Sequence, residues 1–522
     1  MWGLGQLLLV AGALCRARGA PTGDRSLVVR GAFPLIDAPA DDSVPTNTAL
    51  FLRFSYLSVV FSPVTSTAWL AALSPHFRRH VWYIWLRIAL GNGGAAFIKW
   101  AQWSATRADL FPEALCVQFG RLQADAPRHG FGYTRREVEA CCGAKIEAYF
   151  DGGFDRRPVA SGSIAQVHFA RKGGLPLAVK VRHPRVAELM RLDTTLMVGA
   201  ASLVDRLPAL RWLRLPETVA QFSDTLAAQS RLDVEAGELA RFGRAFAGRR
   251  WRDIRFPRPV KCSDGVLIES FEAGRLVNSI VGDARRGCDG DAVRAAYLVQ
   301  RGEDIYLKML LDDGVVHADL HPGNLLYFER DTSGRGRTLT LVDAGMVATL
   351  TRDERENFIG LLESIGAADA RTAARCIRAF SPSNAVMTRA ERNAFDKGVK
   401  SLFDERCRGY DTGVEFGNVV RGILQLVRAH QVRINANYAT LIVNALCLDG
   451  MAADLLPSYS VLDAAKPLLS THRWLCGSRF LFGRSFGRFF FRRFCLPIAW
   501  RFKRRTDAAT QSRLARRIAP KR

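Results

Sequence analysis

The chain has 522 residues, a formal net charge of +24 at pH 7 and a hydrophobic content of 48%. This length predicts two or three structural units, and the apolar content excludes an intrinsically disordered chain. The eleven cysteines contain no Cys-x-x-Cys pair, which excludes a cysteine zinc site and a small disulfide scaffold, so we expect reduced thiols. The basic charge leaves nucleic acid, anionic lipid and phosphorylated substrates as candidate partners.

The amino-terminal segment is apolar and then basic. Residues 1–20 carry Arg16 and Arg18, and no acid precedes Asp24. A secretory signal places its positive charges before the apolar run, so this order favours a mitochondrial presequence, with a short membrane-leaning leader as the alternative. After a Pro- and Asp-rich linker, residues 54–74 carry no charge. They are long enough to span a bilayer, although a buried or interfacial helix fits equally well.

The middle of the chain changes from helical spacing to short strands. Residues 91–123 have helical spacing in their second half. Three β-like runs then follow, separated by turn residues, at 163–171, 176–184 and 265–273. A long helical stretch, residues 185–247, separates the second run from the third.

The pattern after residue 290 is mainly helical. Within it, residues 338–347 are expected to form a short hairpin. The preceding loop at 330–337 is polar and Gly-rich, and we expect it to be exposed. The whole pattern predicts an α+β protein with a small β-rich lobe followed by a larger helical lobe.

The carboxyl-terminal tail is basic and aromatic. Residues 473–522 hold fifteen Lys or Arg against one acid, Asp507. Arginine and aromatic side chains can stack on unpaired bases, but the same composition fits a helix lying on anionic lipid. Because residues 54–74 are also apolar, we expect a lipid or membrane surface rather than nucleic acid.

A turn of four small residues lies inside the first predicted hairpin: Ala160, Ser161, Gly162 and Ser163. Small side chains let backbone N–H groups approach a phosphate. A tight hairpin also needs small residues, so this turn alone does not separate a phosphate site from a structural turn.

Lys180 lies on an otherwise apolar strand and is expected to point to the same side as Ala178 and Arg182. Such a lysine commonly protects a sheet edge. In a phosphoryl-transfer site it contacts nucleotide phosphates and is held by a carboxylate on a nearby helix. Glu235 lies on a helical pattern and is the candidate partner by its order along the chain.

Two acids and an amide follow in the helical lobe. Asp319 and Asn324 have the D-x-x-x-x-N spacing of a phosphoryl-transfer loop, and Asp343 follows a hydrophobic strand and precedes Ala–Gly. In such a site the first Asp orients or deprotonates the attacking group, while the Asn and the later Asp coordinate Mg²⁺.

Two histidines flank Asp319, so residues 315–328 also allow a His/Asp metal site. No third His or Cys lies at ligand spacing from His317 and His321. We therefore expect both histidines to shape the loop. A small-residue hairpin, a strand Lys, D-x-x-x-x-N and D-x-G in this order predict a kinase-like ATP site.

Five motifs in the chain carry a family resemblance. "IKWAQWSATRADLFP", "ASGSIAQVH", "AVKVRHP", "HADLHPGNLL" and "LVDAGMV" together resemble the UbiB family of atypical kinase-like proteins, the aarF-domain-containing kinases. The Trp–Ala–Gln form of the first motif is similar to the type-2 branch of the mitochondrial aarF-domain set. The resemblance runs from about residue 91 to residue 465 and so covers most of the chain.

The resemblance implies a bilobal protein-kinase-like fold with a helical extension over the nucleotide cleft. It also implies ATP, Mg²⁺, a membrane-associated setting at the mitochondrial inner membrane, and lipid or coenzyme Q metabolism with partner proteins of that pathway. Carried over by position, the resemblance implies that Lys180 contacts phosphate and pairs with Glu235, and that Asp319 is the acid of the catalytic loop. Asn324 and Asp343 would bind Mg²⁺, and Glu269 and Phe271 would lie at the hinge beside adenine. Lys99 and Gln102 would belong to the extension that restricts the access of protein substrates.

The chain also departs from the family pattern. The K-x-G-Q motif has Ala101 in place of Gly, and the acids of E-x-D are replaced by Gln229 and Arg231. Because both acids are lost, we expect the extension to be held without the usual salt bridge to Lys99. The D-F-G motif has Ala344 in place of the Phe whose packing normally reports active and inactive states. All three core polar groups are kept, so the pattern predicts nucleotide binding and leaves catalysis open.

We expect six segments along the chain. They are a targeting segment and linker (1–47), a hydrophobic membrane-leaning segment (48–90), a helical extension with the K-x-x-Q motif (91–154), a kinase-like N-lobe (155–275), a kinase-like C-lobe (276–470) and a basic aromatic tail (471–522).

Overall fold

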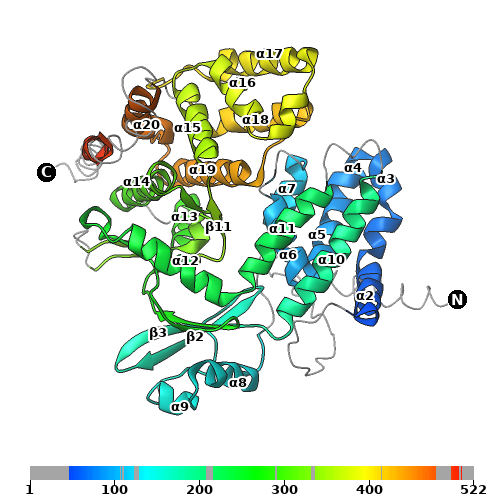
Figure 1. Ribbon diagram of the computed structural model, residues 1–522, viewed down its shortest axis with the longest axis vertical. Helices are drawn as coiled ribbons and strands as arrows, with labels where there is room; N and C mark the ends of the chain where they lie inside the picture. Colours follow the sequence, from blue (N-terminus) through cyan, green and yellow to red (C-terminus); the bar gives the residue numbers. More distant parts are fainter. Residues whose placement is uncertain are drawn as a thin grey trace.

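The structure is a computed structural model that describes residues 46–105, 107, 111–122, 128–206, 215–287, 291–330, 336–412, 414–477, 495–504 and 507. Nearly all of the predicted targeting segment, and much of the predicted tail and of the loop at 330–337, lie outside the described residues. Figure 1 shows amino-terminal helices at the right, a β-rich lobe at the bottom and a helical lobe at the top.

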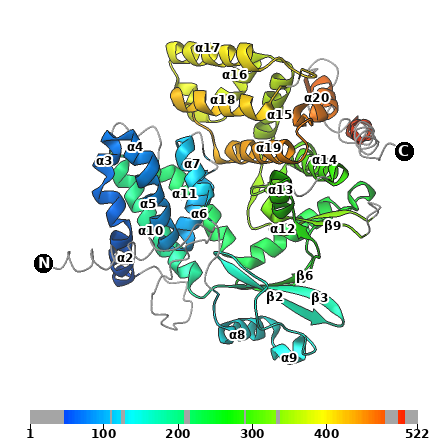
Figure 2. The same cartoon turned by 180° about the vertical axis from the view of Figure 1, so that it is seen from behind.

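A group of helices precedes the first strand. They are α2 (Asn47–Ser66), α3 (Ala68–Leu73), α4 (Pro75–Phe77), the π-helix η2 (Arg78–Trp82), α5 (Tyr83–Gly93), α6 (Ala95–Ala105) and α7 (Glu113–Gly120). The Thr46 side chain caps α2 by accepting a hydrogen bond from the N–H of Ala49 at 3.3 Å. Figure 2 shows α5, α6 and α7 beside α10 (Val186–Val204) and α11 (Leu215–Gln229).

The β-rich lobe is built on five antiparallel strands in the order β1-β2-β3-β6-β5. They are β1 (Ala160–Ser161), β2 (Ala165–Lys172), β3 (Leu175–Arg182), β5 (Pro259–Cys262) and β6 (Val266–Ser270). Side chains alternate between the two faces. Val179 and Ile268 pack on the outer face, under α8 (Phe131–Cys142) and α9 (Ile146–Tyr149), so Lys180 points from the opposite face toward the helical lobe.

The predicted strand runs are confirmed as β2, β3 and β6. The helical stretch predicted between the second and third runs is confirmed as α10, α11 and α12 (Leu232–Ala245) in its described part. These helices connect the strands of the sheet to one another, and α12 brings one face against the sheet and the helical lobe, where Leu232, Leu239 and Phe242 are buried.

The hairpin predicted at 338–347 is wrong. β10 (Thr338–Leu341) pairs with β9 (Leu325–Phe328), whereas β11 (Val347–Thr349) pairs with β8 (Val315–His317). The reason is that the segment 315–328 has a strand on each side of its own loop, and these strands take the ladder hydrogen bonds that a hairpin would use. The remaining short strands of the sheet around β10 and β9 are β4 (Ile254–Arg255) and β7 (Arg275–Leu276).

The larger lobe is helical, as the sequence predicts. Its helices are α13 (Val277–Arg285), α14 (Ala292–Lys308), η5 (Met309–Asp313), η6 (Pro322–Asn324), α15 (Arg352–Gly366), α16 (Ala370–Arg378), η7 (Pro382–Val386), α17 (Arg389–Arg406), α18 (Phe416–Ala429), α19 (Ala436–Leu455) and α20 (Val461–Gly477); η4 (Arg249–Trp251) lies between the lobes. Capping boxes begin α15, at Thr351, and α17, at Thr388. Buried apolar side chains of this lobe form the main hydrophobic core.

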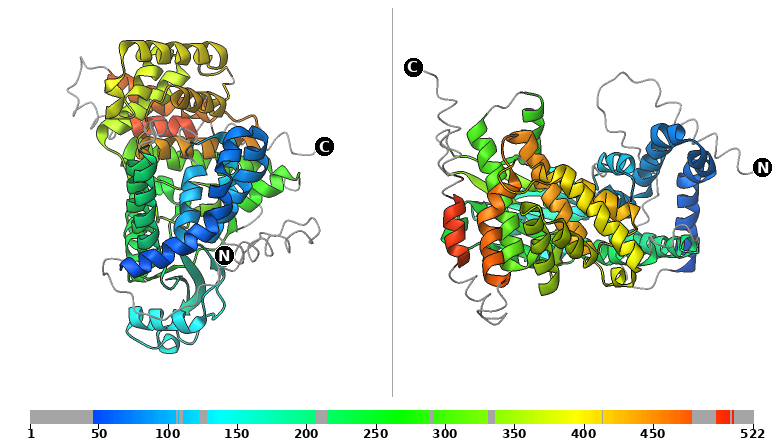
Figure 3. Two further views of the ribbon diagram at one scale, coloured as in Figure 1. Left: turned by 90° about the vertical axis from the view of Figure 1, so that its right-hand side faces the viewer. Right: turned by 90° about the horizontal axis from the view of Figure 1, so that it is seen from above.

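A short helical segment, residues 495–504, packs back onto the helical lobe. Its Trp500 and Lys503 are buried, and Trp500 contacts Trp251 with ring centroids 5.4 Å apart. Figure 3 shows this helix in red, on the side of the lobe away from the amino-terminal helices. The predicted boundary of the tail at 470/471 falls inside α20, and this described part of the tail belongs to the folded body.

Candidate active site

Two loops face each other because of the way the small sheets pair. β8 pairs with β11 on one side of them and β9 with β10 on the other. The loops are the Asp319 loop, residues 318–324, and the Asp343 loop, residues 342–346. The N–H of Ala318 donates across them to the Met346 carbonyl at 2.9 Å. Strand pairing thus brings together polar residues that are distant in sequence.

The predicted D-x-x-x-x-N pair forms a direct contact. Asn324 Nδ2 donates to the backbone carbonyl of Asp319 at 3.0 Å and to its Oδ2 at 3.2 Å. Asp343 Oδ1 accepts a hydrogen bond from the N–H of Gly345 at 2.7 Å. Because the amide nitrogen of Asn324 is held by Asp319, its carbonyl oxygen remains available to a cation.

Both carboxyl groups are ionised at neutral pH. Burial pushes the pKa of Asp319 upward, but the hydrogen bond and charge of His321 and the charge of Lys99 outweigh it and lower the pKa below its ordinary value. Burial also acts to raise the pKa of Asp343, and the charges of Lys180 and Lys99 lower it below the ordinary value. Two ionised carboxylates beside an amide oxygen are a suitable donor set for Mg²⁺.

His317 is a structural residue, as predicted. Its side chain is buried, its Nδ1 accepts the N–H of Asp319 at 3.1 Å, and its Nε2 contacts the backbone carbonyl of Asp343. Both ring nitrogens therefore hold backbone groups. Asn444 on α19, which the sequence motifs do not include, donates to the His317 carbonyl at 2.6 Å and accepts the N–H of Leu320 at 3.3 Å.

His321 shapes the loop and also acts on Asp319. Its Nδ1 accepts the N–H of Gly323 at 2.9 Å, and its Nε2 lies 3.5 Å from Asp319 Oδ2. Burial lowers the pKa of His321, but the hydrogen bond and charge of Asp319 raise it above the ordinary value. The hydrogen bond and charge of His321 in turn favour the ionised form of Asp319.

Lys180 joins the β-sheet to the helical lobe. Its Nζ lies 2.6 Å from Glu235 Oε1 on α12, 3.0 Å from the Val342 carbonyl and 3.2 Å from Glu269 Oε1 on β6. The pairing of Lys180 with Glu235, predicted from chain order, is present in the structure. Because Val342 adjoins Asp343, the lysine also lies beside the Asp343 loop.

The Lys180 cluster, defined as Lys180, Glu235 and Glu269, is strongly buried. Burial would lower the pKa of Lys180, but Glu235 and Glu269 raise it above its ordinary value. Burial raises the pKa of Glu235 despite Lys180. It also raises the pKa of Glu269 to about 7, with Lys180 lowering it and Glu235 raising it further.

The two predicted hinge residues have different environments. Phe271 lies just beyond β6, its N–H donates to the Pro176 carbonyl at 3.1 Å, and its ring packs edge-on against Phe169 with centroids 5.0 Å apart. It is 37% exposed at the point where the chain leaves the sheet, so its place beside adenine stays a prediction. Glu269 instead points into the Lys180 cluster.

The small-residue turn is held by a hydrogen bond from a histidine side chain. Gly162 N–H donates to the Ala165 carbonyl at 2.9 Å, and His183 Nε2 lies 3.0 Å from the Gly162 carbonyl. His183 Nδ1 lies 2.7 Å from His129 Nδ1. Burial lowers the pKa of His183, so this neutral ring donates from Nε2 and accepts at Nδ1. The predicted Ala160–Ser163 turn is thus an ordered hairpin whose phosphate contact stays a prediction.

Known proteins show what this arrangement resembles. Residues 121–377 match the model of the ABC1 atypical kinase-like domain. The chain thus contains an ABC1 atypical kinase-like domain, and relatives of the chain are ABC1 family and UbiB proteins. A mitochondrial ABC1 family protein of Saccharomyces cerevisiae is 26% identical over 82% of this chain and 75% of its own length. The protein named "Probable protein kinase UbiB" of Sodalis glossinidius is 27% identical over 74% and 69%.

A third relative is the protein named "Probable serine/threonine-protein kinase abkC" of Dictyostelium discoideum, 28% identical over 77% of this chain and 66% of its own length. Among solved structures, a Mycobacterium tuberculosis protein bound to erythromycin has a TM-score of 0.40 and 15% identity, over 63% of this chain and 84% of that one. A TM-score of this size carries no argument, so the kinase-like α+β fold rests on the family match and on the lobes described above.

The helices that precede the first strand are held to the rest of the protein by an ion pair and by aromatic contacts. Arg53 Nε on α2 lies 2.6 Å from Asp193 Oδ1 on α10, and both side chains are buried. Trp100 and Trp103 on α6 pack against Phe222 of α11, with ring centroids 5.0 and 5.7 Å apart. These contacts bind α2 and α6 to α10 and α11, the helices that lie between β3 and β6 in the chain.

Lys99 of the extension acts on the acids of the site instead. Its charge lowers the pKa of both Asp319 and Asp343, and within the described part of the chain it forms no ion pair shorter than 4.0 Å. Gln102 Nε2 donates to the Leu122 carbonyl at 3.3 Å and so fixes the end of α7. The replacement Arg231 pairs with Asp233 at 2.6 Å near the surface.

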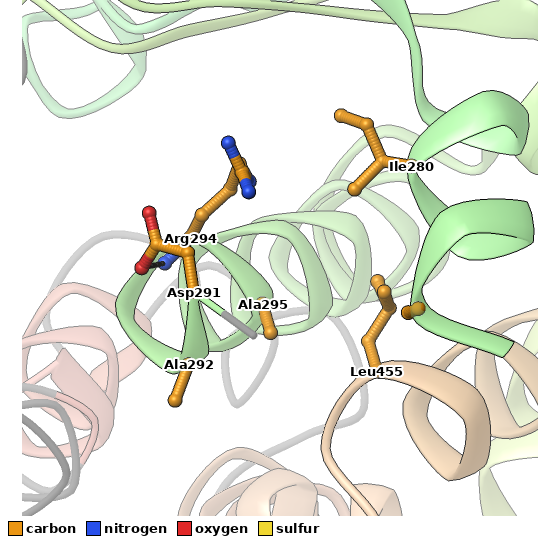
Figure 4. Close-up of a pocket in the computed structure, with 7 residues that line it drawn as sticks. Ile280, Asp291, Ala292, Arg294, Ala295 and Leu455 are labelled. Carbon is orange, nitrogen blue, oxygen red and sulfur yellow. Dashed lines mark hydrogen bonds between the residues drawn. The ribbon is translucent and has the colours of Figure 1, made fainter. Parts of the chain in front are cut away.

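A separate pocket of about 100 Å³ lies between α13, α14 and α19. Figure 4 shows Ile280 and Leu455 on one side of it and Asp291 at the start of α14 on the other. The Asp291 carboxylate caps α14 by accepting the N–H groups of Val293 and Arg294. None of the predicted site residues lines this pocket.

Proposed function

We propose that this ABC1-family protein is an atypical kinase or ATPase that binds ATP with Mg²⁺ between its lobes. The observation that supports it most is the Lys180–Glu235 ion pair beside the Asp343 loop. A lysine held by a helix carboxylate contacts the phosphates of ATP in protein kinases, and acids on the facing loops hold the metal. Asn324 and Asp343 would hold Mg²⁺, with Phe271 beside the base.

Each group has a separate part in phosphoryl transfer. Bound Mg²⁺ would neutralise charge on the transferred phosphoryl group. Lys180 binds phosphate and is aimed by Glu235. The Ala160–Ser163 turn covers the phosphates with its backbone N–H groups. Asp319, held by Asn324, orients the attacking hydroxyl or water and accepts its proton.

The second candidate is a nucleotide-binding scaffold with weak catalysis. Lys99 and His321 lower the pKa of Asp319, and a carboxylate with a lowered pKa is a poorer proton acceptor. The charge of Lys99 also favours the ionised form of Asp343. Such a protein would use bound nucleotide as a structural ligand.

We also propose that this activity belongs to mitochondrial lipid or coenzyme Q metabolism at the mitochondrial inner membrane. Two relatives named as mitochondrial ABC1 family proteins support the mitochondrial part of this proposal. The stretch Asn47–Leu73 is long and apolar enough to span a membrane, and Phe51, Trp69 and Leu73 on it are exposed. We propose that this surface contacts lipid. Sedimentation with cardiolipin-containing vesicles, compared with binding to single-stranded RNA at the same salt concentration, tests lipid against nucleic acid.

ATP turnover separates the enzyme from the scaffold. We expect purified protein with ATP and Mg²⁺ to release or transfer phosphate, and Asp343→Asn to lower the rate by about a hundredfold because Mg²⁺ loses a ligand. The control is Asp454→Asn, on the surface of α19, where Asp454 pairs with Arg285. Nucleotide binding without turnover supports the scaffold, and the absence of both would contradict the proposed function.

A further inference from the structure

Three oxygen atoms surround the ammonium group of Lys180. They belong to Glu235 at 2.6 Å, to the Val342 carbonyl at 3.0 Å and to Glu269 at 3.2 Å. A lysine ammonium has three N–H donors. Two of them donate hydrogen bonds to Glu235 and to the Val342 carbonyl, and Glu269 adds an ion pair. At most one donor therefore remains for a phosphate oxygen, and it has the Glu269 carboxylate beside it.

Glu269 is the least well satisfied of the three partners. Its contact is the longest, its side chain is 3% exposed, and its second oxygen, Oε2, is buried without a hydrogen-bond partner among the described residues. Burial raises the pKa of Glu269 to about 7, and the charges that face it are Lys180, Glu235 and Asp343. An unpartnered buried carboxylate oxygen is costly, so Glu269 is the partner that is most easily displaced.

Sheet geometry places Glu269 where a nucleotide must pass. Ala178 lies directly opposite Glu269 in the pairing of β3 with β6, and residues two apart on a strand share a face. Glu269 and Lys180 are therefore on the same face of the sheet. β6 ends one residue later, at Ser270, where the chain begins its crossing to the helical lobe through Phe271. A nucleotide with its base at this crossing and its phosphates on Lys180 lies along Glu269.

We propose that the Glu269 carboxylate occupies the place of a phosphate on Lys180 in the nucleotide-free protein, and that nucleotide phosphates must displace it. This inference rests on the proposed nucleotide-binding function. The carboxylate and the phosphate are both anions, so they compete for the same N–H donor and repel each other. Glu269 is thus a positioning residue that limits affinity, whereas Glu235 stays on Lys180 and aims it.

Titration calorimetry at pH 8, where Glu269 is ionised, tests the displacement. The probes are ADP with Mg²⁺, which carries phosphates, and adenosine, which carries none. For Glu269→Gln we expect about tenfold tighter ADP binding, because one charged competitor is removed, and unchanged adenosine binding. The matched control is Glu147→Gln in the same lobe, where the half-exposed Glu147 pairs with Arg135 on the other side of the sheet; its affinities should equal those of the wild type.

A second variant, Glu269→Leu, removes the carboxylate without adding a polar group, and it should also bind ADP more tightly. Thermal unfolding without nucleotide checks that each variant is folded. ADP affinity that is unchanged or weaker in folded Glu269 variants would overturn the inference, and a parallel loss of adenosine affinity would show that Glu269 contacts the base instead. If neither the wild-type protein nor the variants bind ADP or adenosine, the proposed function itself is contradicted. This outcome differs from the one that overturns the inference about Glu269.

Discussion

Two buried lysines in this protein each face several carboxylates, but their surroundings differ. Lys180 lies between Glu235 and Glu269, and its side chain is 13% exposed. Lys503 lies 3.0 Å from Asp304, 3.1 Å from Asp507 and 3.5 Å from Glu303, and its side chain is 0% exposed. Both lysines have a pKa raised by these acids against the effect of burial.

The difference lies in what adjoins each cluster. Beside Lys180 is the Asp343 loop, and the charge of Asp319 also acts on Asp343, so these two acids can receive a cation. Lys503 sits in a segment whose Trp500 packs against Trp251, and it fastens residues 495–504 to α14. A buried, multiply paired lysine is therefore no evidence of function by itself. Lys180 differs from Lys503 because it is partly exposed and lies beside Asp343, an ionised carboxylate that can bind a metal ion.

The largest effect is expected at the structural lysine. Lys503→Met leaves three carboxylates buried without their cation, so we expect a loss of about 3–5 kcal/mol in the free energy of unfolding. Urea denaturation measures it, and Arg501→Met on the exposed side of the same helix is the control, expected to stay within about 0.5 kcal/mol. A loss for Lys503→Met as small as that of the control would contradict a fastening role.

The next effect separates the two clusters by ligand affinity. Glu235→Gln removes the charge that aims Lys180, and we expect about tenfold weaker ADP binding in the presence of Mg²⁺. Glu303→Gln makes the same chemical change in the Lys503 cluster and should leave ADP affinity unchanged. Titration calorimetry measures the ADP affinity of both variants. Equal losses of affinity would mean that the two clusters do not differ in function.

A third difference between the two clusters concerns pH. The pKa of Glu269 is raised from 4.5 to about 7 and that of Glu303 from 4.5 to about 8, chiefly by burial. The folded state thus binds protons more tightly than the unfolded state, and this contribution to stability is present below pH 4.5 and is lost as pH rises through about 7 and about 8.

Each group should account for a slope of no more than about 1.4 kcal/mol per pH unit. Urea denaturation from pH 5 to pH 9 measures the slope. Glu303→Gln should reduce the slope of stability against pH both with and without ADP. Bound ADP should change the contribution of Glu269 to that slope. A slope that Glu303→Gln leaves unchanged would argue against this assignment.

Much of the site followed from the sequence because the kinase-like motifs keep a specific order. The Lys180–Glu235 pair was predicted from residue type and order alone, and it is present. The D-x-x-x-x-N spacing singled out Asp319 and Asn324, and the structure shows them in direct contact. The sequence placed Glu269 at the hinge, whereas in the structure its side chain lies beside Lys180. The register of β3 against β6 decides this position, and a local sequence pattern does not give that register.

Other features depend on contacts between distant segments. The hairpin predicted at 338–347 failed because β10 and β11 each find a strand from residues 315–328. Asn444 supports the Asp319 loop from α19, and no motif indicates it. Lys503 lies in a basic tail whose composition suggested a lipid-facing helix. Its buried acidic partners Glu303 and Asp304 on α14 show why the described segment 495–504 packs against the helical lobe.

The central claim is that Lys180 belongs to a nucleotide site, and a single comparison tests it most directly. ADP with Mg²⁺ is titrated into wild-type protein and into folded Lys180→Met protein. The wild type should bind one equivalent of ADP, with affinity that falls when Mg²⁺ is removed, and the variant should lose binding by at least about tenfold. Undiminished, Mg²⁺-dependent ADP binding to Lys180→Met would contradict this account.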